Sequence, residues 1–193
     1  MPPGDDSSTR KSTHILVALV ENKPGVLNRV ASLFRRRSFN IESLTVGHTE
    51  SPDISRMTIV VDTRKTSAAL VEKNLNKLIN VIDVQDVTHA PIVVRDLALI
   101  KVTAPAERRA EIMQLVDIFR AKIVDVYAES VIVEVTGPEA KIDSMVELLH
   151  PFGIIEMVRT GRVAMVRGSG YRAPYVLSDN GTNGLRVNPT PNL

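Results

Sequence analysis

The residues with the clearest chemical potential lie in one short segment, Glu21 to Leu27, which reads Glu-Asn-Lys-Pro-Gly-Val-Leu. Asn22 is of a type that caps helices well, and Pro24 is favoured in the first turn of a helix. Gly25 lets a ligand approach the main chain because it carries no Cβ. The unpaired N–H groups and the positive dipole end of a helix that begins here would form a site for a carboxylate.

A zwitterionic amino acid is one ligand that such a segment could hold. It would need the anion site for its carboxylate and an amide or carbonyl oxygen for its ammonium group, and the Asn22 side chain can supply one such oxygen. A capped helix that binds no ligand explains the same residues, and caps are far commoner than ligand sites. The residues of this segment leave both interpretations open.

No other combination of residues indicates catalysis. Cysteine is absent, so neither disulfides nor thiolate chemistry are available. Glu42, Asp62 and Asp83 are accompanied by no nucleophile and no paired carboxylate, and we interpret them as ordinary sheet-edge or solvent-facing charges. The four histidines are scattered without the spacing of metal ligands, and they are His14, His48, His89 and His150. We therefore expect no metal site.

Composition argues against polyanion and membrane partners. The formal net charge is +2, and no apolar run approaches the ~20 residues that span a bilayer. Arg35 to Arg37 could be a nucleic-acid patch, but the strands lack the stacking aromatics of RNA-binding modules, so a solvated helix end is the better interpretation. Residues 1–13 include Asp5 and Asp6 and no apolar stretch, which does not resemble a secretory signal. We expect a cytoplasmic protein with a flexible N-terminal lead.

The elements that would position the segment follow from hydrophobic periodicity. An apolar, β-branched run from His14 predicts a buried strand, and the apolar spacing after Pro24 predicts an amphipathic helix that ends near Ser38. The rest of the first half predicts a hairpin, a helix and a closing strand, with strands at 40–48, 57–61 and 81–87 and helical apolar positions at Leu70, Leu75, Leu78 and Ile79.

The same order recurs in the second half of the chain. The pattern predicts strands at 97–102, 123–127, 131–135, 154–158 and 163–166, and helices at 109–120 and 140–149. This repeated βαββαβ order predicts an α+β fold of two ferredoxin-like modules, each with two helices on one face of its sheet. We expect a short connection at 91–96, a second module at 97–168, and a disordered tail at 169–193, which is rich in Gly, Asn and Pro.

Longer motifs resemble a known family. The run HILVALVENKPGVLNRVASLFRRRSFNIESLTVG resembles the start of an ACT domain, a regulatory module that binds amino acids, here at 14–90. With it, SRMTIVV from Ser55, FRAKIVDV from Phe119 and RTGRVAMVRG from Arg159 resemble the small regulatory subunits of acetohydroxyacid synthase, also called acetolactate synthase. The motifs run in the family's order from His14 to Gly168, nearly all of the foldable chain.

The resemblance implies a non-catalytic subunit. Such a subunit binds and activates a separate catalytic subunit and confers feedback inhibition by branched-chain amino acids, chiefly valine, in branched-chain amino-acid biosynthesis. Cofactors are then expected only on the catalytic partner, namely thiamine diphosphate, Mg and FAD. An amino-acid-binding ACT regulator of another enzyme is the alternative, and an enzyme that uses the loop to hold a phosphate or carboxylate substrate is a more distant one.

The resemblance also implies where the effector binds. ACT domains of this family pair across a two-fold axis, so a homodimer or larger assembly is expected, with the effector at the interface. The corresponding residues of the first loop form one wall, and Asn40 and Ile41 of the neighbouring chain form the other. The implied effector-binding residues are Asn22, Lys23, Pro24, Gly25, Val26, Leu27, Asn40 and Ile41. The second module has Thr103 to Glu107 at the matching turn, without a glycine, so no second effector site of this kind is expected there.

Overall fold

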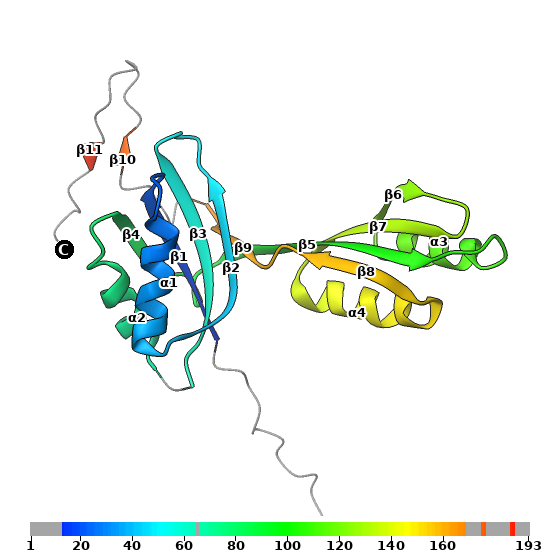
Figure 1. The fold of residues 1–193 in the computed structure, drawn as a ribbon, viewed down its shortest axis with the longest axis horizontal. Helices are drawn as coiled ribbons and strands as arrows, with labels where there is room; N and C mark the ends of the chain where they lie inside the picture. Colours follow the sequence, from blue (N-terminus) through cyan, green and yellow to red (C-terminus); the bar gives the residue numbers. More distant parts are fainter. Residues whose placement is uncertain (1–12, 65, 169–174, 177–185, 188–193) are drawn as a thin grey trace, which may run out of the picture. The chain divides into compact units, whose positions relative to one another are not determined.

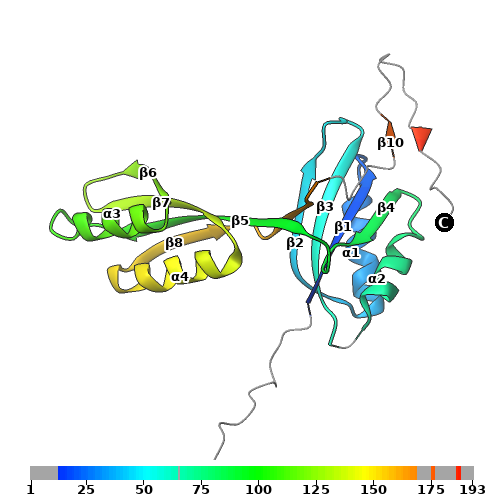
Figure 2. The same cartoon turned by 180° about the vertical axis from the view of Figure 1, so that it is seen from behind.

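The protein is described here from a computed structural model, which describes residues 13–64, 66–168, 175–176 and 186–187. The described residues divide into two compact units, one formed by those up to 92 together with those from 166 onward, and the other by 93–165. Each unit holds one repeat of the βαββαβ order, which confirms the α+β fold of two ferredoxin-like modules (Figure 1, and from behind in Figure 2). No helix of the described residues is long and apolar enough to cross a membrane.

The βαββαβ repeat of the first unit consists of four strands and two helices. Their bounds are β1 (Thr13–Glu21), α1 (Val26–Arg37), β2 (Asn40–His48), β3 (Ile54–Asp62), α2 (Ala68–Leu75) and β4 (Val81–Asp86). The strands form one antiparallel sheet in the order β2-β3-β1-β4, so β2 is an edge strand. The predicted range of β2 matches the strand at both ends.

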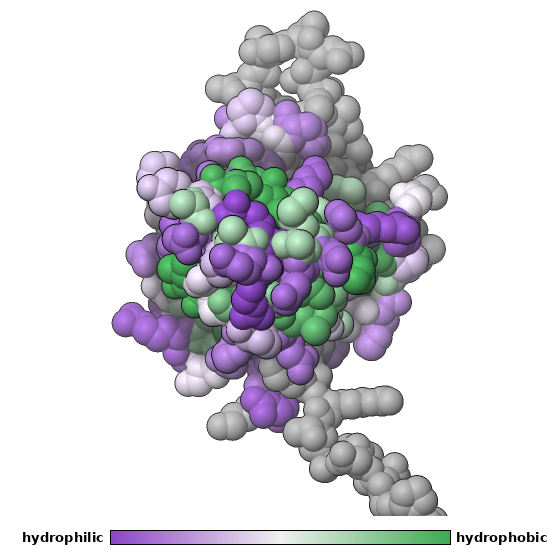
Figure 3. All heavy atoms as spheres, turned by 90° about the vertical axis from the view of Figure 1, so that its right-hand side faces the viewer, coloured by the Kyte–Doolittle hydropathy of each residue, from purple (hydrophilic) through white to green (hydrophobic). Residues whose placement is uncertain are grey.

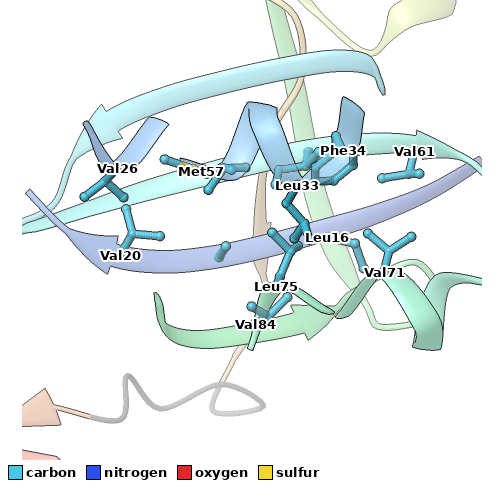
Figure 4. Close-up of a cluster of buried hydrophobic side chains, with 13 residues drawn as sticks. Leu16, Val20, Val26, Leu33, Phe34, Met57, Val61, Val71, Leu75 and Val84 are labelled. Atoms are coloured by element: carbon cyan, nitrogen blue, oxygen red, sulfur yellow. The ribbon is translucent and has the colours of Figure 1, made fainter. Parts of the chain in front are cut away.

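The core of the first unit lies between the sheet and its two helices (Figure 4). Alternate residues of β1 and β3 face it, including Leu16 and Ile59, which are fully buried. Val30 and Phe34 of α1 and Leu75 of α2 pack against them. Each of these large side chains contributes about 1.5–3 kcal/mol when it leaves water. Because β1 and α1 are both fixed by this core, the loop that joins them has a defined place.

Helix α1 ends at a residue in the left-handed conformation. Ser38 has φ of 53°, and its N–H donates to the carbonyl groups of Phe34 and Arg35. Arg35, Arg36 and Arg37 form the last turn, where their charges complement the negative end of the helix dipole. All three are exposed, as expected for a solvated helix end.

The second unit repeats the arrangement, with a five-stranded sheet in the order β6-β7-β5-β8 and β9 also paired to β5. The bounds are β5 (Ile92–Thr103), α3 (Arg109–Ile118), β6 (Lys122–Val126), β7 (Ser130–Gly137), α4 (Glu139–Leu149), a 3-10 turn η1 (His150–Phe152), β8 (Ile154–Arg159) and β9 (Val163–Val166). Its core is formed by one face of β5 and β7 with α3 and α4, and Ile100, Ile112 and Met145 are fully buried in it.

Two predictions about the organisation of the chain were wrong, and a third, on the two ends of the chain, stays a prediction. Residues 92–96, expected in a short connection, are the beginning of β5, because a Val- and Ile-rich stretch continues the strand and β9 gives β5 a further partner. Leu78 and Ile79, expected on the second helix, lie beyond its end at Leu75, and Ile79 is 86% exposed. The flexible lead and the disordered tail lie outside the described residues, except for Thr13 and two paired two-residue strands, β10 (Tyr175–Val176) and β11 (Arg186–Val187).

Candidate ligand site

The N-cap position of helix α1 is occupied by Gly25 and not by Asn22. Gly25 is the N-cap residue, in the left-handed conformation with φ of 83°, and no side chain caps the helix. The predicted cap by Asn22 is wrong because capping depends on the backbone conformation of the residue next to the helix, and Pro24 and Gly25 form a turn that separates Asn22 from it. A Cβ at position 25 would meet no atom within 4 Å, so the space beside this glycine is open.

Asn22 instead ties the loop to the turn between β2 and β3. Its Nδ2 donates to the carbonyl of Pro52 at 2.8 Å, and its main-chain N–H donates to the carbonyl of Asp53 at 2.7 Å. The side-chain oxygen of Asn22 takes no part in this contact. Asn22 thus has a structural role and keeps an acceptor oxygen for a ligand.

A second set of contacts holds the loop from the side of β4. Lys23 Nζ lies 3.0 Å from Glu21 Oε1, and Asn80 Nδ2 donates to Glu21 Oε2. Arg29 Nη1 donates to Asn80 Oδ1 at 2.7 Å, so Asn80 connects the strand end to the helix. The hydrogen bond from Asn80 and then that from Lys23 lower the pKa of Glu21. Sequence reasoning gave Glu21 no role of its own and missed Asn80, because the two residues meet only in the fold and 59 positions separate them.

The start of α1 has donors and positive charge to offer an anion. The N–H of Val26 points to the carbonyl of Lys23 at a long 3.4 Å, and within the described chain the N–H groups of Leu27 and Asn28 have no acceptor. The first turn contains no acidic residue, while Lys23 and Arg29 lie beside it. Free amides, a helix dipole and nearby cations together can hold a carboxylate.

The side chains of Val26 and Leu27, the first two residues of α1, differ in whether a ligand could reach them. Val26 is only 4% exposed and belongs to the core, so only its main chain can meet a ligand. Leu27 is 46% exposed, which leaves an apolar surface beside the free amides. Val46 lies near the same end of the sheet and is 42% exposed. Its register partner Met57 belongs to the core, so Val46 lies on the face of the sheet that the helices cover. The sequence analysis did not single out Val46, although its place in an edge strand was predicted.

Asn40 and Ile41 lie at the other end of the same sheet. Asn40 pairs with Asp62 at the end of β3, whereas Glu21 pairs with Ile54 at its beginning. The eight residue-to-residue steps from 54 to 62 correspond to about 26 Å along the strand. Within one chain the two expected walls of the site are therefore far apart. Ile41 is half-buried against the core, and Asn40 is exposed.

Asp62 was predicted to be an ordinary sheet-edge or solvent-facing charge, and the solvent-facing part of this prediction is wrong. It is 9% exposed and accepts hydrogen bonds from Arg64, including one from the main-chain N–H at 3.0 Å. These bonds, first from the Arg64 side chain and then from its main chain, lower the pKa of Asp62 to about 2, and a hydrogen bond from the Asn40 side chain adds to them. The carboxylate is thus ionised at neutral pH.

The matching turn of the second unit is filled by its own side chains. Ala104 is fully buried, and Arg109 Nη2 donates to the carbonyls of Ala104, Tyr127 and Ala128 at 3.1, 3.1 and 2.6 Å. Among the described residues, groups of three or more His, Asp or Glu placed to hold a metal ion are absent.

A βαββαβ module whose first loop opens onto free helix amides is the architecture of the ACT class of regulatory domains. Residues 16–83 match the family model described as the ACT domain of the small subunit of acetohydroxyacid synthase, and residues 95–168 match the model described as the small subunit of acetolactate synthase. The chain therefore belongs to the family of acetolactate synthase small subunits.

Individual relatives agree with this assignment. The chain is 57% identical to the probable acetolactate synthase small subunit of Archaeoglobus fulgidus, over 81% of this chain and 98% of that one. It is 46% identical to the acetolactate synthase small subunit of Bacillus subtilis, over 82% of this chain and 93% of that one. The crystal structure of the small subunit from Thermotoga maritima superposes with a TM-score of 0.75 at 43% identity, covering 81% of this chain and 98% of that one.

Proposed function

We propose that this chain is a regulatory subunit that binds the catalytic subunit of acetolactate synthase, raises its activity and makes it sensitive to valine. The observation that carries the effector part is the open start of α1. There the N–H groups of Leu27 and Asn28 face no acceptor of the described chain, and Gly25 leaves the approach open. Family membership supports the partner, because a small subunit implies a larger catalytic one.

The effector enters with its carboxylate at the helix start. Lys23 and Arg29 add positive charge there, and the exposed Leu27 provides an apolar contact for the effector's side chain. An apolar contact of this kind distinguishes one methylene by only about 1–3 kcal/mol. Valine is the proposed effector, and leucine and isoleucine should bind with related affinity.

A second copy of the chain supplies the other wall. Strand β2 is at the edge of the sheet, and antiparallel pairing of two such edges about a two-fold axis makes the strands run in opposite directions. Asn40 of one copy would then lie near the end of β2 in the other, which is the end that carries the loop of Asn22 to Gly25. This arrangement brings together residues that one chain keeps about 26 Å apart.

The second unit is proposed to contribute to contact with the catalytic subunit. Large apolar patches on a surface often mark interaction sites. Figure 3 looks onto the end of this unit and has apolar side chains among polar ones over its surface. Of fifteen large apolar side chains exposed in the described chain, eleven lie in this unit: Met113, Ile118, Val124, Val126, Tyr127, Leu148, Ile155, Met157, Val158, Val163 and Met165.

The arginines Arg159 and Arg162 of the β8–β9 region are engaged within the chain. Arg159 binds Asp96 and Asp143, with Nη1 at 2.7 Å from Asp143 Oδ1, and Arg162 pairs with Glu139. We therefore assign the contact to apolar side chains, with these ion pairs fixing the turn that carries them.

The proposal is tested by mixing the purified chain with the catalytic subunit of acetolactate synthase from the same source. We expect the two to co-purify, the activity to rise, and valine to lower it, while the chain alone forms no acetolactate. Valine binding without any effect on that enzyme would favour an ACT regulator of another enzyme. Turnover by the chain alone would contradict a regulatory role.

A further inference from the structure

Asn40 and Asp62 face each other across β2 and β3, and this pairing bears on which ligand the effector site selects. They are register partners, so their side chains lie on the same face of the sheet. Asp62 is 9% exposed and is held by Arg64, whose Nε lies 2.8 Å from Oδ2 and 3.0 Å from Oδ1. The side chain of Asn40 is hydrogen-bonded to the same carboxylate.

The ionisation of Asp62 fixes the orientation of the Asn40 amide. A carboxylate has acceptors and no donor, so only the NH₂ group of Asn40 can bond to it. The amide oxygen of Asn40 then points away from Asp62, and within the described residues this oxygen has no donor. Asn40 is exposed, so the oxygen is available to a ligand.

We propose that Asp62 is a specificity-determining positioning residue: by turning the Asn40 oxygen outward, it makes the effector site prefer an α-amino acid to the 2-oxo acid of the same skeleton. An ammonium group only donates hydrogen bonds, and it matches an outward oxygen. A keto oxygen only accepts and would face that oxygen without a donor, which is costly in a site shielded from water. This inference rests on the proposed effector site.

The selection acts through the dipole of Asn40 and not through a free negative charge. Arg64 neutralises Asp62 at close range, so the ion pair as a whole attracts neither a cation nor an anion strongly. Glu42 also acts on the Arg64 charge, and it lies on β2 next to Ile41. Because Asp62 is only 9% exposed, its effect on the ligand would pass through Asn40.

The test compares two ligands on three forms of the full chain. Isothermal titration measures the Kd of L-valine and of 3-methyl-2-oxobutanoate, its 2-oxo counterpart, on the parent chain, on Asp62→Asn and on the double variant Asn40→Asp with Asp62→Asn. In Asp62→Asn an amide at 62 can accept or donate, so Asn40 can turn. We expect the preference for valine to fall at least tenfold. Asp117→Asn, on the exposed side of α3, is the matched control and should leave the preference unchanged.

The double variant gives a result that a purely structural role would not. It places a carboxylate at 40 and an amide at 62, so position 40 again offers only acceptors and the preference for valine should return. If Asp62→Asn and the double variant do not fold, Asn40→Ala carries the test, because it keeps Asp62 and removes the outward oxygen at an exposed position. An unchanged preference for valine in Asn40→Ala would overturn the inference.

The outcomes separate the inference from the proposed function. If the parent chain binds valine in preference to the oxo acid and Asp62→Asn keeps the full preference, Asp62 has no such role and the effector site stands. If the parent chain binds neither ligand, the proposed effector site is wrong and the inference fails with it.

Discussion

Replacing Gly25 tests whether a carboxylate binds at the start of α1. The matched pair of variants is Gly25→Asp and Gly25→Asn. A side chain fits at this position, because a Cβ meets nothing within 4 Å. With φ at 83°, an L-residue has a cost of about 1–2 kcal/mol, and Asn and Asp are the types that tolerate this region best. The two variants have the same shape and differ in charge.

The expected effect on binding follows from the charge. In Gly25→Asp a carboxylate lies close to the position of the effector's own carboxylate. At a separation of about 5 Å and an effective dielectric constant of about 20, two unit charges repel by about 3 kcal/mol. That energy corresponds to about two orders of magnitude in Kd. The Asp variant should unfold no earlier than the Asn variant, since an acidic N-cap favours the helix dipole.

Isothermal titration with valine, paired with thermal unfolding, checks both expectations. We expect the Asn variant to bind within about tenfold of the parent chain, because it adds no charge at the site and the strain of an L-residue at position 25 is the same in the free and the bound chain. The Asp variant should bind about a hundredfold more weakly than the Asn variant. Equal valine affinity of two folded variants would refute the assignment of the carboxylate to this helix start.

Three further outcomes test the description of the first unit. Leu75→Ala should lower the free energy of unfolding in urea by about 2–5 kcal/mol because Leu75 is fully buried, whereas Leu70→Ala on the same helix, 47% exposed, should change it by less than about 0.5 kcal/mol. Burial, together with the charges of Asp86 and Asp83, raises the pKa of Glu72, so the ionised form disfavours the fold above about pH 4, and Glu72→Gln should raise the melting temperature at pH 7 but not at pH 3. The pKa of Asp62 is lowered from 3.8 to about 2, so its ionised form adds stability above about pH 4 that is lost as the pH falls toward 2. Arg64→Gln should therefore make the free energy of unfolding depend less on pH between about 4 and 2 than it does in the parent chain.

The arrangement of strands and helices could be predicted from the sequence because it depends on local periodicity. The ranges of β2 and β9 were predicted to the residue, and the buried faces of α1 and β3 followed from the spacing of Val30, Phe34 and Ile59. The length of β5 could not, since an extended Val-rich stretch continues as a strand only when a partner such as β9 is available.

The site was predictable in part. The segment of Asn22 to Gly25 was identified from residue types, but which residue caps the helix depends on φ at Gly25, which the sequence does not specify. The burial of Asp62 and its contacts with Asn40 and Arg64 arise from the register of β2 on β3. Glu21 and Asn80 meet through sheet pairing over a long sequence separation, and no local pattern carries that information.

The distance between the two walls of the proposed effector site, the loop of Asn22 to Gly25 and Asn40, determines how that site can form. A site made from the loop and from Asn40 can form only between two chains, because β3 separates these residues by about 26 Å in one chain. Dimerisation and effector binding should therefore be coupled, so that valine stabilises the dimer by mass action.

Mixing two defective variants tests this central claim most directly. Gly25→Asp damages the loop wall and Asn40→Ala damages the strand wall, so neither homodimer should bind valine well. After the two are unfolded together and refolded in equal amounts, half of the dimers should be mixed. Each mixed dimer contains one intact site, so titration should detect valine binding with near-parental affinity at about a quarter of all sites. No recovery of binding, with mixed dimers verified by a tag on one variant, would place both walls in one chain and contradict the account.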